Sequence, residues 1–253
     1  MYIDTHAHLN FDPFIRDPQP YIDRALQAGV TRMIVPAADL ASSEKAVALA
    51  ERYEGVFAAV GVHPQDAAAV PDNYLSLLAS MLDHPKVCAV GEVGLDYYRR
   101  YAPRDVQMRV FREQAELARS LGYPLIIHNR EADDDTFSLL EDLAYFNVQF
   151  HCFGGDAAYA RNVIERGALV SFTGVITFSQ KAREVARTLP PEKLMIETDC
   201  PWMAPVPYRG KPNEPAYVVE VAAAFAEIFG RSVEDIAALT TATAERFFRL
   251  SQT

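Results

Sequence analysis

The sequence contains a pair of histidines whose spacing suits a metal ion. His6 and His8 are separated by one residue and follow a short apolar run that ends at Thr5. Side chains alternate faces along an extended chain, so both imidazoles point the same way and can reach one ion. Asp4 shares this parity, and a carboxylate commonly accepts the second ring N–H of a metal-bound histidine. The segment predicts two metal ligands, with Asp4 orienting one of the rings.

Further histidines and carboxylates follow later apolar runs: His63, Glu92, His128, His151 and Asp199. Glu92 is flanked by glycines, which allow the backbone to turn tightly and bring the carboxylate inward. Its two oxygens can bridge two cations. His128 and His151 each end an apolar run, where a buried imidazole without a partner would be costly.

Together these side chains form a hard ligand set of nitrogen and oxygen donors, which suits Zn, Mn, Co or Mg. The candidate ligands are His6, His8, Glu92, His128, His151 and Asp199. Any one of them alone would more often be structural, and the alternative for the first pair is a polar strand end without metal. Their recurrence at the end of one run after another favours a shared site. Cys152 and Cys200 are adjacent to two candidates, but alternation points them away.

The elements that must position these residues recur about every 30 residues. Eight short β-branched or apolar runs predict strands at 2–5, 32–36, 56–60, 87–91, 124–127, 148–150, 169–172 and 194–197. Amphipathic windows predict helices at 21–29, 42–55, 104–122, 157–167, 216–229 and 233–250, and the acidic run 131–135 predicts the start of another. The proline-rich stretch 201–215 suits neither element.

This alternation predicts an α/β fold, a TIM (β/α)8 barrel, with residues 1–253 as a single domain. The chain length of 253 agrees with the roughly 250 residues typical of that barrel. Catalytic groups collect at the carboxyl ends of its strands, where the candidate ligands fall.

Composition limits the classes of function. The formal net charge is −10, which argues against coating long stretches of duplex, since backbone binding depends on Lys and Arg. Three distant cysteines make no disulfide framework. Neither a signal peptide nor a membrane span is expected, so the sequence predicts a cytoplasmic protein that does not bind membranes.

Seven segments together resemble the TatD-like metal-dependent DNases, a branch of the amidohydrolase-type barrels, over essentially the whole chain. They are DTHAH (4–8), GVHP (61–64), GEVGLD (91–96), HNREA (128–132), HCF (151–153), ETDCP (197–201) and RGKPNEP (209–215). The resemblance implies a TIM barrel of the metallo-dependent hydrolase type with a site for two divalent ions. His6, His8 and Asp199 would bind one ion, His128 and His151 the other, and Glu92 would bridge them. Gln65 and Thr243 depart from the family pattern, the first at a substrate contact and the second at a position expected to concern packing.

A two-metal site can activate water for hydrolysis, with Asp199 and Glu92 as the catalytic residues. The resemblance favours a deoxyribonuclease or exonuclease that cleaves phosphodiester bonds at single-stranded or end-frayed nucleic-acid ends. His63, Arg130, Arg209 and Lys211 are the expected substrate contacts, the cations binding phosphate. The same barrel also serves carbonyl chemistry, so hydrolysis of an amide or ester, including an aminoacyl ester, or deamination is the alternative. The third hypothesis is a metal-dependent binding or structural protein without turnover.

Overall fold

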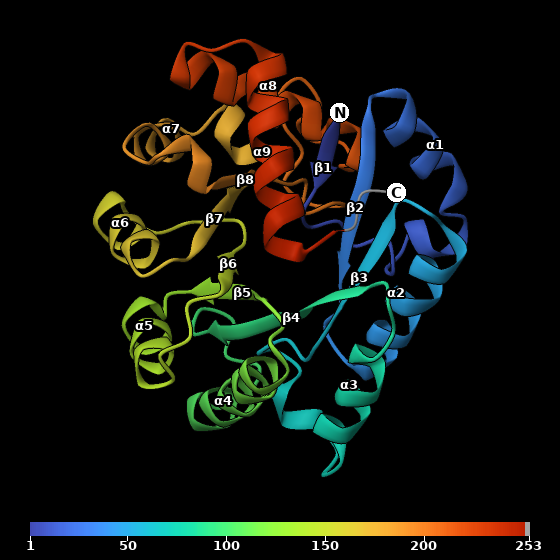
Figure 1. The fold of residues 1–253 in the computed structure, drawn as a ribbon, viewed down its shortest axis with the longest axis vertical. Coiled ribbons are helices and arrows are strands. Elements are labelled where there is room, and N and C mark those ends of the chain that lie inside the picture. Colours follow the sequence, from blue (N-terminus) through green and yellow to red (C-terminus); the bar gives the residue numbers. More distant parts are fainter. Residues whose placement is uncertain (251–253) are drawn as a thin grey trace.

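The computed structural model describes residues 1–250 and contains an eight-stranded parallel sheet in chain order, surrounded by an outer ring of helices (Figure 1). Its strands are β1 (Tyr2–Asp4), β2 (Val30–Pro36), β3 (Val56–Val60), β4 (Val87–Asp96), β5 (Leu125–Arg130), β6 (Val148–Phe150), β7 (Leu169–Phe172) and β8 (Leu194–Ile196). The N–H of Thr5 donates to the carbonyl of Ile196 at 3.2 Å, which joins β1 to β8. The predicted TIM barrel is confirmed.

The helices that pack on the barrel are α1 (Gln19–Gln27), α2 (Leu40–Arg52), α3 (Tyr74–Leu82), α4 (Arg104–Leu121), α5 (Asp133–Asp142), α6 (Ala157–Glu165), α7 (Gln180–Arg187), α8 (Val218–Phe229) and α9 (Val233–Phe248). Single 3-10 turns are η1 (Phe14–Arg16), η2 (Ala67–Ala69), η3 (Gly174–Thr177), η4 (Pro191–Lys193) and η5 (Pro215–Tyr217). All six predicted helical windows contain a helix, whereas α3 and α7 were not predicted. Residues 251–253 of the expected domain lie outside the described residues.

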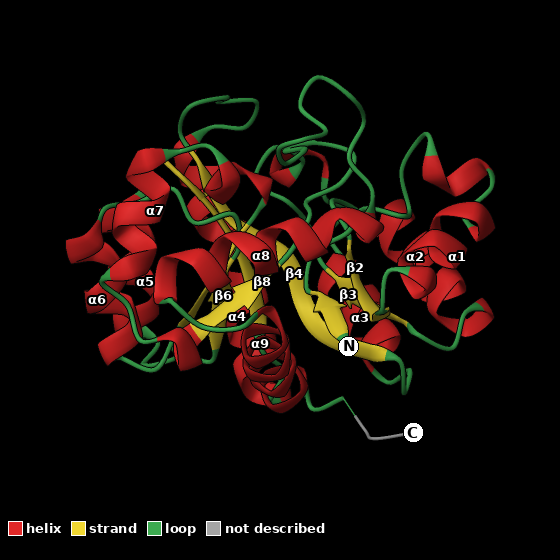
Figure 2. Cartoon of the chain, turned by 90° about the horizontal axis from the view of Figure 1, so that it is seen from above, coloured by secondary structure: helices red, strands yellow, loops and turns green. Residues whose placement is uncertain are grey.

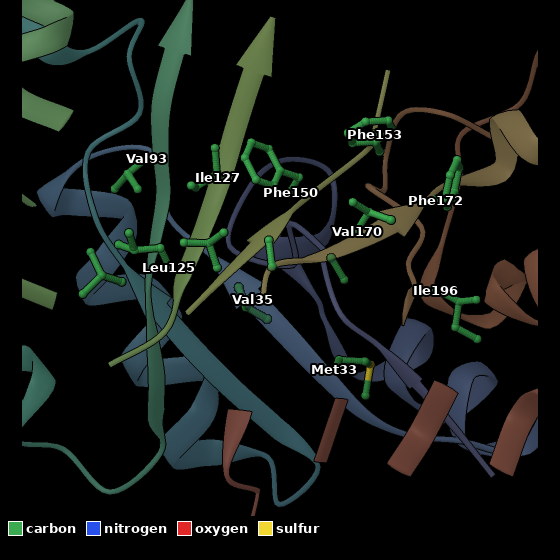
Figure 3. Packing of buried hydrophobic residues seen from close by; sticks show 14 of the residues in the cluster. Met33, Val35, Val93, Leu125, Ile127, Phe150, Phe153, Val170, Phe172 and Ile196 are labelled. Carbon is green, nitrogen blue, oxygen red and sulfur yellow. The ribbon is translucent and has the colours of Figure 1, made fainter. Parts of the chain in front are cut away.

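Two apolar layers hold the barrel. One packs the outward side chains of the strands against the helices, among them Val35, Leu125 and Val170 (Figure 3). The other uses alternate strand positions, such as Ile3 and Ile126, and packs them against side chains of α9. Figure 2 shows α9 on the side opposite the long loops, so α9 closes one end of the barrel and leaves the other for a site.

Thr243 on α9 is buried, and its hydroxyl donates to the carbonyl of Glu192 at 3.3 Å. This contact lies at the end of the barrel that α9 closes, as expected for a packing residue. No helix within residues 1–250 combines the length and the apolar character needed to cross a bilayer.

Strand β4 differs from its prediction. It was expected to end at Gly91, with Glu92 in a turn, but it continues to Asp96 and stays paired with β5 after a register shift between Val90 and Val93. Irregularities of this kind re-aim individual side chains. Glu92 therefore reaches the end of the barrel from within the strand.

Gly94→Ala should lower the free energy of unfolding by more than about 2 kcal/mol, because strained backbone and a steric clash each contribute. The φ angle of Gly94 is +133°, and an added Cβ would lie 2.0 Å from the carbonyl oxygen of His128. Urea denaturation measures the effect. Gly122→Ala is the matched control, since its φ is +76° and an added Cβ meets nothing within 4 Å, so it should cost roughly 1 kcal/mol. Equal stability of the two variants would contradict this view of the β4–β5 contact.

Candidate metal centre

The seam that closes the barrel positions the first group of candidate ligands. The N–H of Asp199 donates to the carbonyl of His6 at 2.8 Å, and the N–H of His8 donates to the carbonyl of Cys200 at 3.1 Å. These backbone bonds bring the three side chains together, with Asp199 Oδ1 at 3.8 Å from His6 Nε2 and 3.5 Å from His8 Nε2. The His6–His8 pair and Asp199 therefore lie together although Asp199 follows His8 by 191 positions in the chain.

Glu92 lies between this group and a second group of imidazoles. Its Oε2 lies 3.4 Å from His6 Nε2 and 3.7 Å from His8 Nε2. Its Oε1 faces His151 Nε2 at 2.7 Å, His128 Nδ1 at 2.9 Å and His63 Nε2 at 3.5 Å. The carboxylate is only 4% exposed. Each of its oxygens thus serves a different set of ring nitrogens, which is the arrangement a bridging ligand requires.

His63 lies deeper in this cluster than its expected role as a substrate contact required. Its ring packs edge-on against His128, with the ring centroids 4.5 Å apart, and His63, Glu92 and His128 have donor atoms within 4.8 Å of one another. The side chain is therefore placed to reach a metal ion as well as a substrate. Its role in substrate binding stays a prediction.

The donor atoms fit divalent metal ions. Three groups of nitrogen and oxygen donors meet within 4.8 Å, namely His6 with His151 and Asp199, His6 with His8 and Glu92, and His63 with Glu92 and His128. The Nε2 atoms of His6 and His8 lie 3.1 Å apart. No cysteine belongs to any such group within residues 1–250. Imidazole and carboxylate donors without sulfur suit Zn, Mn, Co or Mg.

The two carboxylates of the cluster, Glu92 and Asp199, both have lowered pKa values. Burial alone would raise the pKa of Glu92, but the attraction of His151 and His63 and hydrogen bonds from His128 and His151 hold it well below the ordinary value. The pKa of Asp199 is also lowered, because a hydrogen bond from His8 and the charge of His6 outweigh burial. Both carboxylates are therefore ionised and available to bind cations.

Asp4 does not orient a histidine ring, so that prediction is wrong. Its Oδ1 accepts the backbone N–H of His6 at 3.2 Å and that of Thr198 at 2.9 Å, and Oδ2 accepts the Thr198 hydroxyl at 2.5 Å. Closure of β8 against β1 supplies these donors and occupies both oxygens. Burial raises the pKa of Asp4 to about 8. Asp4 thus ties together the backbones of the two segments that carry His6 and Asp199.

Two buried carboxylates that support the cluster were not assigned from the sequence. Asp96 Oδ2 lies 3.2 Å from His128 Nε2 and accepts a hydrogen bond from Gln65 Nε2 at 3.0 Å. Gln65, which departs from the family pattern, therefore holds a carboxylate against a candidate ligand. Asp96 ends the segment GEVGLD (91–96) that resembles the family, and this place in a recognised segment was the signal available in the sequence.

Glu197 is the second such carboxylate. Its Oε1 accepts the N–H of Cys152 at 2.5 Å and lies 3.7 Å from His151 Nδ1, while Oε2 accepts hydrogen bonds from Gln149 and Ser171. Glu197 is fully buried. Its partners come from β6, from β7 and from the residues directly after β6, so it fixes the segment that carries His151.

The three cations expected to bind phosphate are exposed. Arg130 ends β5, and its guanidinium lies 4.0 Å from the ring centre of Tyr98. Arg209 lies 3.7 Å over the ring of Phe178, and Lys211 lines the same surface cavity as Arg209. All three lie in strand ends or loops beyond them, outside the cluster of candidate ligands.

The sequence is similar to a known protein family and to several known proteins over nearly its whole length. A model of the family described as TatD related DNase matches residues 3–249. The chain is 40% identical to the uncharacterized metal-dependent hydrolase YabD of Bacillus subtilis, over 99% of this chain and 100% of that protein. It is 31% identical to the 3′-5′ ssDNA/RNA exonuclease TatD of Citrobacter koseri, over 98% and 99% of the two chains.

A solved structure agrees with these matches. The crystal structure of YjjV, a TatD homologue from Escherichia coli K12, superimposes with a TM-score of 0.93 at 32% identity, covering 99% of this chain and 98% of that one. The resemblance inferred from the seven sequence segments is confirmed over the whole barrel. The chain belongs to the family of TatD-related DNases and is a metal-dependent hydrolase.

Proposed function

We propose that the protein is a phosphodiesterase that uses two divalent ions, Zn, Mn, Mg or Co, and removes nucleotides from single-stranded or end-frayed nucleic-acid ends. The observation that carries this proposal is Glu92, whose two oxygens face different groups of imidazoles. One ion would be held by His6, His8 and Asp199, the other by His128 and His151, with Glu92 shared.

Ions bound in this way would supply an activated water and neutralise charge that develops on the phosphate. Asp199 is ionised and lies beside His8, at the edge of the cluster, where it can take a proton from that water. Glu92, ionised and buried, fixes the spacing of the two ligand groups. Asp96 and Glu197 keep the neighbouring rings in place.

The substrate class rests on charge and on relatives. Arg130, Arg209 and Lys211 present three cations at the loop end of a barrel whose net charge is −10, so few phosphates would be engaged. The Citrobacter relative is named a single-stranded DNA and RNA exonuclease. Many two-metal amidohydrolases bridge their ions with a carboxylated lysine, and the glutamate in that role here favours the nuclease over amide or ester hydrolysis.

Two single-stranded substrates of identical sequence, one linear and one circular, test whether hydrolysis begins at strand ends. We expect the metal-loaded protein to degrade the linear strand to mononucleotides and to leave the circle intact. Chelation of the metal should stop degradation. Cleavage of the circle at a comparable rate would contradict the end-directed function.

Salt dependence tests the small footprint. Binding that neutralises two or three single-strand phosphates should give a slope of log affinity against log salt of about −1.4 to −2.1, since each phosphate contributes about −0.7. Arg130→Ala or Lys211→Ala should each make the slope shallower by about 0.7 without changing metal content. Arg187→Ala removes the same charge at the last residue of α7 and should leave the slope unchanged. A much steeper native slope would indicate a long duplex footprint instead.

A further inference from the structure

Trp202, the only tryptophan of the chain, lies at the boundary between the candidate metal centre and solvent. Its indole packs edge-on against His8, with ring centroids 5.3 Å apart and planes at 74°. Its backbone N–H donates to the carbonyl of Asp199 at 3.0 Å. The side chain is nevertheless 53% exposed. Trp is highly buried on average, so an indole left open beside the ligands of a proposed site calls for an explanation.

The loop that carries Trp202 is held in place by a buried asparagine. The side-chain amide of Asn213 donates to the carbonyls of Trp202 at 2.7 Å and Thr198 at 2.8 Å, and its backbone N–H donates to the carbonyl of Pro201 at 3.0 Å. Asn213 is only 1% exposed. These bonds fold the proline-rich stretch 201–215 back onto the strand end, so the indole is presented on a fixed backbone.

A surface cavity of about 300 Å³ adjoins the indole, and its walls combine aromatic and cationic side chains. Trp202, Phe178, Met203, Arg209 and Lys211 line it, with Arg209 lying 3.7 Å over the Phe178 ring. None of its lining residues, all within the described part of the chain, is acidic. In a protein of net charge −10, this combination of an exposed indole and two cations suits a ligand that has both a flat ring and a negative charge.

We propose that this cavity holds the unpaired base of the terminal nucleotide, stacked on Trp202, while Arg209 and Lys211 bind the adjoining phosphate. The proposal rests on the phosphodiesterase function above and specifies how that site recognises its substrate. Stacking on an aromatic side chain tolerates any base, because every base has a π face, and strengthens binding roughly 5- to 150-fold. A base inside a duplex cannot stack in this way, so the cavity would require a single-stranded or frayed end.

The test combines removal of a terminal base from the strand with substitution of Trp202 in the protein. Binding of internally labelled phosphorothioate oligothymidylates to the metal-loaded protein is measured by fluorescence anisotropy, with the base intact or removed at one end and then at the other. For the native protein, removing the base at one of the two ends should weaken binding roughly 5- to 150-fold. In Trp202→Ala the same removal should have almost no effect, and Trp202→Phe should restore most of the difference.

Fluorescence of the native protein gives an independent readout, because all tryptophan emission comes from Trp202. The intact strand should quench this emission, and the strand without the relevant base should quench it far less. Tyr101→Ala is the matched control: Tyr101 is 65% exposed in the loop after β4 and does not line the cavity. It should leave the dependence on the base unchanged.

Several results would overturn the proposal. If the protein cleaves the strands but base removal at either end has no effect, the stacking site is wrong and the phosphodiesterase function stands. Equal effects of base removal in native protein and Trp202→Ala, or an equal loss in Tyr101→Ala, would lead to the same conclusion. If no strand is bound or cleaved, the proposed function and the stacking site both fail.

Discussion

Glu92→Ala is expected to release both metal ions together and to abolish hydrolysis. The two carboxylate oxygens face separate ligand groups, at 3.4 Å from His6 Nε2 and 2.7 Å from His151 Nε2, so one truncation removes a ligand from each. Removing a group that merely supports a metal ligand costs roughly 10- to 100-fold in affinity, and a shared ligand should cost more than that at both sites. Elemental analysis after dialysis, together with competition against a chelator, measures the loss.

Two further variants separate loss of the ligand from loss of the fold. Glu92→Gln keeps the volume of the side chain and removes its charge, so it should also lose both ions while circular dichroism stays native. Glu245 lies on α9, the helix that closes the opposite end of the barrel, and pairs with Arg32 on β2; Glu245→Gln breaks this ion pair and should retain a full metal complement. A folded Glu92→Ala protein that keeps both ions would show that Glu92 does not bridge.

Asp199→Asn should lower kcat by roughly 10²- to 10⁴-fold while KM changes little, because the amide fills the same space but cannot take a proton. Asp199 Oδ1 lies 3.5 Å from His8 Nε2 and 3.8 Å from His6 Nε2. Its lowered pKa keeps the carboxylate ionised, as a proton acceptor must be. The assay is run at saturating metal so that weaker binding at this ligand is compensated, and the metal content of the variant is measured in parallel.

Asp72→Asn provides the matched control, since Asp72 is exposed in the loop before α3 and should not affect kcat. An effect of Asp199→Asn confined to KM, with kcat intact at full metal occupancy, would remove Asp199 from the catalytic step. Intact kcat and KM at full occupancy would remove it from the site altogether.

The positions of the candidate ligands were predictable because the barrel obeys a simple rule. Parallel strands in chain order bring their carboxyl ends to one rim, so polar residues that follow different apolar runs must meet there. This rule predicted that Asp199 lies beside His6 and His8 although most of the chain separates them in sequence. In the structure Asp199 lies within 3.8 Å of both rings. Which histidines share each oxygen of Glu92 could be predicted only from the family resemblance.

What the sequence did not reveal depends on partners contributed by other strands. Asp96 and Glu197 stand in the recognised segments, but their roles arise from His128, Gln65 and Gln149, which sequence position does not place beside them. The extent of β4 was also missed, because glycines at 91 and 94 suggested a turn where the strand continues with a register shift.

The helices that escaped prediction lack an amphipathic pattern of adequate length. The α3 sequence YLSLLASML is apolar almost throughout, so it shows no polar face, and α7 has only eight residues, QKAREVAR, with three apolar ones. Helical periodicity needs a longer window and two distinguishable faces. Both helices instead follow from the barrel architecture, in which a helix connects each pair of successive parallel strands.

The most direct test of the central claim is a side-by-side assay of metal-loaded protein and its Glu92→Ala variant on end-labelled single strands, small esters and amides. We predict stepwise loss of nucleotides from one end of the strands by the native protein, no such activity in the variant, and slow or absent turnover of the esters and amides. Hydrolysis of an ester or amide without cleavage of any phosphodiester would contradict the account and identify the protein as a carbonyl hydrolase on the same barrel.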